Sequence, residues 1–150
     1  MSQAKKVFTR MCLNNWGGID HKVLEFHEYV NLFSGKSGSG KSTVMDAIQV
    51  ILYGSFSPSF LNKAADDAKN RRSVLSYLRG EQKDGSANRK DCDFCSVIAL
   101  EIEDTGTHII TCIGIAFEVR KSDSEIKKFV YFSHSGKMPE SEYLTEQGVC

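Results

Sequence analysis

The stretch Gly35-Lys36-Ser37-Gly38-Ser39-Gly40-Lys41-Ser42, followed by Thr43, decides the fold. It fits the phosphate-loop pattern G-x-x-x-x-G-K-[ST] at every fixed position. A short β-prone apolar segment, residues 29–33, precedes it, and residues 43–53, which contain no Gly or Pro, follow it. The sequence therefore predicts a strand, a glycine-rich loop and a helix in that order, whereas a flexible Gly/Ser linker would lack these flanks.

The chemistry of this loop predicts a nucleotide site built from residues 35–43. Glycines can adopt positive φ and let the backbone approach a ligand closely, so that successive N–H groups point at phosphate oxygens. The following helix adds unpaired N–H groups and the positive end of its dipole. We expect Lys41 to reach the β- and γ-phosphates of ATP and the Ser42 hydroxyl to bind Mg²⁺.

Length and composition place the chain among soluble globular proteins. Its 150 residues suffice for one domain with a core, and it is 41% hydrophobic and 25% charged. The formal net charge is zero, so any affinity for nucleic acid must come from a local surface. No secretory signal and no apolar run of about 18 residues is visible, which predicts a cytoplasmic protein without a membrane span.

The cysteines are expected to be reduced thiols, because no secretory signal is present. There are five, at positions 12, 92, 95, 112 and 150. Cys92 and Cys95 form a C-x-x-C, but a zinc site would need a second pair of ligands, and a redox motif would need a thioredoxin-like context. Neither is found, so these are expected to be two ordinary cysteines at the start of a strand.

A β-hairpin is expected before the loop and two helices after it. Residues 7–14 and 22–26 read as strands joined by a turn. The helix at 41–53 is apolar nearly all round and should be buried, with Gly54 as its C-cap. Its main stripe is Val44, Ala47, Ile48, Ile51 and Leu52. A short helix within 71–79 would turn inward Val74, Leu75 and Leu78.

The second half of the chain reads as a meander. Residues 95–103 and 107–120 are strands joined by a hairpin turn at 104–106, and residues 128–132 form a third strand. The apolar face of the second strand is Thr111, Ile113, Ile115, Phe117 and Val119. A mostly polar tail follows from residue 134, with no element expected to close it.

Residues 11–80 resemble the start of an SMC-type ATPase head. Leu13-Asn14-Asn15-Trp16-Gly17 is similar to the strand that precedes the loop in that group, and Ser42-Thr43-Val44-Met45-Asp46-Ala47-Ile48 is similar to its S-T-x-x-D-A-I helix. The Asn-Trp-Gly form resembles MukB-like condensins, including the SMC subunit of Wadjet plasmid-defence complexes. Segments 46–49, 60–65 and 72–80 resemble that last subgroup most.

The resemblance implies an α/β fold of the P-loop NTPase type, an ABC/SMC-head-like N-terminal lobe with an antiparallel β-meander beside the nucleotide-binding strand and helix. In the family, the signature motif S-G-G-[QE] and the Walker B strand lie on a C-terminal lobe, beyond long coiled-coil arms. Neither motif and no heptad run is recognised in this sequence. Residues 1–150 are therefore expected to form one lobe, incomplete without a C-terminal lobe.

The resemblance also implies cofactors, partners and a function. ATP and Mg²⁺ are the implied cofactors, and hydrolysis would need the C-terminal lobe of the same head and a second head in a homodimer. Further implied partners are DNA, bound without sequence specificity, and accessory condensin subunits, with no membrane. The implied function is DNA organisation, chromosome maintenance or plasmid defence by a cytoplasmic, nucleoid-associated protein. The loop departs from the family's sequence at Ser37, where many such heads carry Asn.

A basic stretch, residues 63–90, is the second candidate site. It holds eight Lys or Arg against four Asp or Glu, and its end at 83–90 reads as a polar loop. The resemblance suggests that Arg71, Arg72 and Arg79 contact DNA. They would bind phosphate and add affinity without specificity; the alternative is a solvated surface.

A complete small P-loop enzyme, such as a nucleotide kinase or a GTPase-like protein, is the alternative function. It would need its own magnesium carboxylate at the end of an apolar strand. Glu101, after Val97-Ile98-Ala99-Leu100, is the candidate. Because Ile102-Glu103 continues the alternation, we expect Glu101 to be a solvent-facing strand residue instead.

Overall fold

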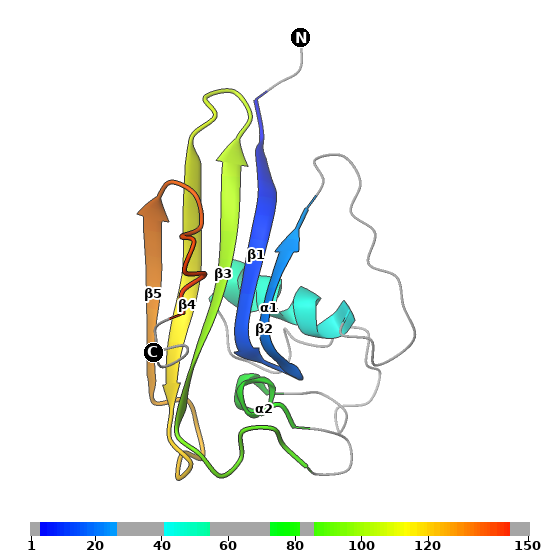
Figure 1. Cartoon of the computed structure of the whole chain (residues 1–150), viewed down its shortest axis with the longest axis vertical. Helices are drawn as coiled ribbons and strands as arrows, with labels where there is room; N and C mark the ends of the chain where they lie inside the picture. The colour runs from blue at the N-terminus through cyan, green and yellow to red at the C-terminus, as the bar shows by residue number, and fades with distance from the viewer. Residues whose placement is uncertain (1–3, 27–40, 55–72, 82–85, 145–150) are drawn as a thin grey trace.

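The computed structural model describes residues 4–26, 41–54, 73–81 and 86–144. In this part of the chain an antiparallel five-stranded sheet, in the order β2-β1-β3-β4-β5, carries a helix on one face and a second, short helix at one end (Figure 1). The elements are β1 (Lys6–Trp16), β2 (Ile19–Glu25), α1 (Lys41–Tyr53), α2 (Val74–Arg79), β3 (Phe94–Asp104), β4 (Ile110–Val119) and β5 (Lys128–Ser135). The predicted hairpin, helices and meander are confirmed, whereas the predicted strand at 29–33 lies outside the described residues.

The main core lies between the sheet and α1. Strand alternation sends Met11 and Leu13 of β1, and Ile98 and Leu100 of β3, to the same face of the sheet. These side chains are fully buried and belong to one cluster with the inner side of α1. Figure 1 shows α1 crossing behind the sheet and α2 beneath the turn that joins β1 to β2.

Residues 136–144 cover part of the opposite face, where the sequence predicted no closing element. Met138 is buried against Cys12, Ala99 and Cys112, which alternate with the main-core residues along their strands. The segment is also hydrogen-bonded to the sheet, because the Asn14 side-chain amide donates to the Glu142 carbonyl at 2.9 Å. Both faces of the central strands are therefore buried.

The helices differ from the prediction in which side chains they bury. Within α1, Val50 is fully buried whereas Leu52 is 46% exposed, so the helix is buried on one side only. In α2, Tyr77 points inward in addition to the predicted Val74 and Leu78, while Leu75 is only partly buried. Both helices end at a glycine with positive φ, which is the predicted Gly54 for α1 and Gly80 for α2.

The prediction of reduced thiols is wrong for Cys95, which is disulfide-bonded. Cys12 and Cys112 are buried and free, and Cys92 is exposed and free, so the C-x-x-C is not closed on itself. Among the described residues, no group of three or more His, Cys, Asp or Glu side chains could hold a metal ion. None of the helices described is long and apolar enough to span a bilayer.

Candidate nucleotide-binding site

The predicted phosphate loop ends where α1 begins. Helix α1 starts at Lys41, the fixed lysine of the motif, and Ser42 is its second residue. The loop residues 35–40 lie outside the described part of the chain. The first turn of α1 contains no acidic residue, so no carboxylate there opposes a bound anion at the positive end of the helix dipole.

The turn between β1 and β2 lies directly against this end of α1. The Trp16 indole N–H donates to the Thr43 carbonyl at 2.9 Å, and both residues are buried. Gly17 has φ +60°, and a Cβ there would lie 2.6 Å from the Thr43 Cγ2 methyl. The turn can approach the helix this closely only with glycine at this position.

Helix α2 completes the support from the other side. The Tyr77 ring stacks on Trp16 with centroids 4.9 Å apart and an interplanar angle of 9°. Its hydroxyl donates to the Asp46 carboxylate of α1, and its carbonyl accepts from the Gly17 N–H at 2.6 Å. The stack, the two hydrogen bonds and the Trp16 contact join β1, α1 and α2 around the helix end that carries the motif.

Sequence reasoning quoted Trp16 and Asp46 only for their resemblance to a family motif, and did not assign Tyr77 a role. The available signal was that Trp16 and Tyr77 each carry a polar group on a large aromatic ring. Such residues are usually buried with a hydrogen-bond partner for the indole N–H or the phenol O–H. The partner itself could not be predicted, since Tyr77 and Asp46 are 31 residues apart in the chain.

Of the three predicted nucleic-acid contacts, the structure describes only Arg79. Its Nη2 donates to the Asp123 carbonyl at 2.6 Å and to the Arg120 carbonyl at 3.3 Å. These contacts tie the C-terminal end of α2 to the connection between β4 and β5, which is a structural role. Arg71 and Arg72 lie outside the described residues, so the nucleic-acid contact stays a prediction.

The expectation that Glu101 faces solvent is wrong. Its side chain is buried, and its carboxylate accepts hydrogen bonds from the Thr9 hydroxyl at 2.7 Å and from the Met138 N–H at 2.6 Å. Alternation along β3 places it on the same face as Ala99, and residues 136–144 cover that face. Because α1 lies on the other face, Glu101 points away from the candidate site and cannot serve it as the magnesium carboxylate.

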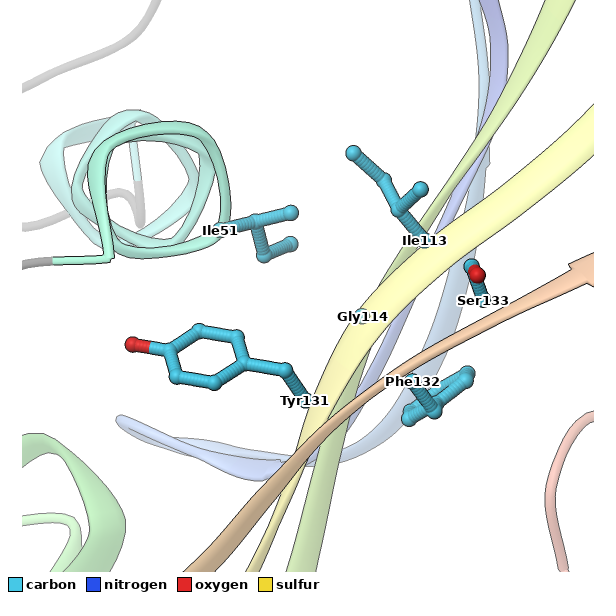
Figure 2. A pocket seen from close by; sticks show the side chains of 6 residues that line it. All are labelled: Ile51, Ile113, Gly114, Tyr131, Phe132 and Ser133. Atoms are coloured by element: carbon cyan, nitrogen blue, oxygen red, sulfur yellow. The ribbon is translucent and has the colours of Figure 1, made fainter.

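A cavity of about 320 Å³ lies between the C-terminal part of α1 and strands β4 and β5. Figure 2 shows Ile51 of the helix facing Ile113, with the Tyr131 side chain reaching toward the helix and Phe132 on the other side of β5. The Tyr131 hydroxyl donates to the Gly54 carbonyl at 3.0 Å. The lining contains no charged side chain and lies at the end of α1 opposite Lys41, so this cavity is not the phosphate site.

Two comparisons with known proteins bear on this site. Residues 8–68 match a family model described as the P-loop containing region of AAA domain. Over 74 residues the chain is 39% identical to the C subunit of the nuclease SbcCD from Staphylococcus haemolyticus (strain JCSC1435). The aligned part makes up 47% of this chain but only 6% of that protein, so the chain spans a small fraction of its relative's length.

The matches confirm the resemblance predicted from the sequence, which is to the N-terminal lobe of SMC-like P-loop ATPases. The matched family region contains the whole phosphate-loop motif, α1 and the β1–β2 hairpin. Of the elements that support the start of α1, the β1–β2 turn therefore comes from the region shared with known P-loop proteins, while α2 and β3 to β5 lie beyond it.

Proposed function

We propose that this chain, a relative of SMC-like P-loop ATPases, is the nucleotide-binding N-terminal lobe of an ATPase head that acts on DNA. It binds ATP and Mg²⁺ in the loop formed by residues 35–43. Lys41 contacts the β- and γ-phosphates, and the Ser42 hydroxyl binds the metal. The observation that carries the proposal is the complete phosphate-loop pattern, whose fixed lysine is the first residue of α1.

Hydrolysis is proposed to need parts that the described residues do not provide. Phosphoryl transfer to water requires held phosphates, a bound metal and a positioned water. The only strand carboxylate that sequence reasoning considered, Glu101, lies on the face away from α1. We therefore assign the remaining groups to a C-terminal lobe of the same head and to a second head, which meet this lobe across the nucleotide.

Exposed apolar side chains support a partner surface on this lobe. Leu52 and Tyr53 at the end of α1, and Phe129 and Tyr131 on one face of the edge strand β5, are all more than two-fifths exposed. The Tyr131 hydroxyl donates to the Gly54 carbonyl, so these side chains lie on neighbouring elements, and a contiguous exposed apolar patch is typical of interaction sites. The C-terminal lobe of the head is the proposed occupant.

The DNA-related role is supported by the relative, which is named as a subunit of a nuclease. We propose that the assembled protein organises DNA in chromosome maintenance or plasmid defence, with condensin-like accessory subunits, in the cytoplasm at the nucleoid. Arg71 and Arg72 are the stronger candidates for DNA phosphate contacts. Arg79 is the weaker one, because its guanidinium already donates to backbone carbonyls.

A complete small P-loop kinase or GTPase-like enzyme fits the observations less well. Such an enzyme needs a magnesium carboxylate close to the phosphate loop, and Glu101 lies on the wrong face of the sheet for that role. All strand pairs among the described residues are antiparallel, whereas open nucleotide-binding α/β folds use mostly parallel sheets.

Calorimetric titration with Mg-ATP tests the proposal. Lys41→Ala should abolish binding, because the charge aimed at the phosphates is lost. Lys36→Ala is the matched control, since Lys36 lies in the same loop at a variable position of the pattern. Equal affinity in the wild type and Lys41→Ala would refute the nucleotide site. Ser42→Ala should instead weaken the dependence of binding on magnesium.

A further inference from the structure

Arg89 is a buried cation that the sequence placed in a polar loop. Its side chain is only 7% exposed, and burial lowers the pKa of the guanidinium, which Asp20 partly offsets. A buried charge is costly unless its donors are paired. The guanidinium also lies over the Phe94 ring, 5.7 Å from the centroid, so one face of its plane is covered as well.

The three nitrogens of this guanidinium bind three acceptors in two segments of the chain, the end of α2 and the β1–β2 hairpin. Nε donates to the Leu78 carbonyl at 2.7 Å, at the end of α2. Nη2 donates to the Gly17 carbonyl at 2.6 Å, in the β1–β2 turn. Nη1 pairs with the Asp20 carboxylate at 3.1 Å, at the start of β2. One side chain thus fixes the turn relative to α2.

Gly17 connects this arginine to the nucleotide loop. Its carbonyl accepts from Arg89, and a Cβ on it would lie 2.6 Å from the Thr43 methyl in the first turn of α1. Gly80 leaves the room for this arrangement, since a Cβ there would lie 2.6 Å from the Gly17 oxygen and 3.1 Å from Arg89 Nη2. A displacement of the guanidinium must therefore move the turn on which the start of α1 rests.

We infer that Arg89 is a positioning residue for nucleotide binding, acting through Gly17 on the first turn of α1. The inference rests on the proposed function. Arg89 does not touch the nucleotide; it sets the place of the helix end that carries Lys41. The planar guanidinium directs donors at three acceptors in fixed directions, which a lysine ammonium on a flexible stem does not reproduce.

The test compares Arg89→Met and Arg89→Lys with Met138→Ala, a control that removes a buried side chain from the opposite face of the sheet. Mg-ATP affinity is measured by calorimetry under conditions where urea titration shows each variant to be folded. The emission of Trp16, the sole tryptophan, reports on the packing of the turn. Arg89→Lys keeps the charge and most of the volume, so it decides the question if Arg89→Met does not fold.

Both arginine variants should lose about tenfold or more in ATP affinity, equivalent to one lost charge-assisted hydrogen bond, and should shift the Trp16 emission. Met138→Ala should lose stability but keep its affinity. Arginine variants that bind ATP as tightly as Met138→Ala would overturn the inference while leaving the proposed function intact. If Lys41→Ala binds ATP as tightly as the wild type does, the proposed function is refuted, and this inference is refuted with it.

Discussion

Gly17→Ala should be among the most damaging single-methyl additions in the described part of the chain. The new Cβ would meet the Thr43 Cγ2 at 2.6 Å, well inside van der Waals contact, and the backbone there has φ +60°. A non-glycine residue in the left-handed region costs about 1–2 kcal/mol, and forcing an extra carbon into a packed site costs about 1–3 kcal/mol. The expected loss in free energy of unfolding is the sum of these, about 2–5 kcal/mol.

The two costs can be separated with Thr43→Ser, which deletes the methyl and keeps the hydroxyl. Gly17→Ala in that background should cost only the backbone part, about 1–2 kcal/mol. The double-mutant cycle should therefore show a coupling of about 1–3 kcal/mol between the two positions. Mg-ATP affinity should fall in Gly17→Ala and recover largely in the double variant, because the start of α1 returns to its place.

The assay is urea unfolding followed by the fluorescence of Trp16, which lies beside Gly17 and stacks on Tyr77. The midpoint gives the change in stability, provided that the slope of the transition stays the same. If Gly17→Ala lowers the free energy of unfolding equally in the wild type and in Thr43→Ser, contact with the Thr43 methyl is not the cause of the loss. That result would refute the argument that this turn positions α1.

The remaining predictions concern residues away from this turn. Glu101→Leu should lower the free energy of unfolding by about 1–3 kcal/mol, because the buried Met138 N–H loses its acceptor, while leaving Mg-ATP affinity unchanged; a loss of affinity measured by calorimetry would contradict the assignment. Burial and the nearby Glu142 raise the pKa of the Cys12 thiol to about 12, so at about pH 8 a thiol reagent should modify exposed Cys92 and spare Cys12; mass spectrometry that finds both modified at equal rates would refute this. Replacing Arg71 and Arg72 with Glu should weaken duplex DNA binding by the assembled protein. The slope of the logarithm of the binding constant against the logarithm of the salt concentration should become shallower by about 0.9 for each phosphate that is no longer neutralised. An unchanged slope would mean that these arginines are only solvated.

The elements that could be predicted from the sequence are those set by local signals. The phosphate-loop pattern, a run without Gly or Pro and a terminal glycine gave the bounds of α1 as Lys41–Tyr53, which the structure reproduces. Alternation and tight turns likewise predicted the hairpin and the meander, with errors of a few residues at the strand ends. Each of these signals acts within about ten residues of chain.

The elements that could not be predicted depend on contacts between distant segments. Arg89 looked like part of a polar loop because nothing near it in sequence shows that its acceptor, Gly17, lies 72 residues away. Glu101 looked solvent-facing because the sequence does not show that residues 136–144 fold back over that side of the sheet. The candidate site follows the same division, because its proposed ligand-binding residues come from a local motif and its supporting residues are seen only in the fold.

The most direct test of the account is steady-state phosphate release from Mg-ATP by the purified chain over a wide range of protein concentration. The account predicts nucleotide binding with almost no turnover by this chain, and turnover that rises more steeply than the protein concentration once a C-terminal lobe is supplied and two heads can meet. Robust turnover by the chain alone, first order in protein and lost in Lys41→Ala, would contradict it and favour a complete small P-loop enzyme.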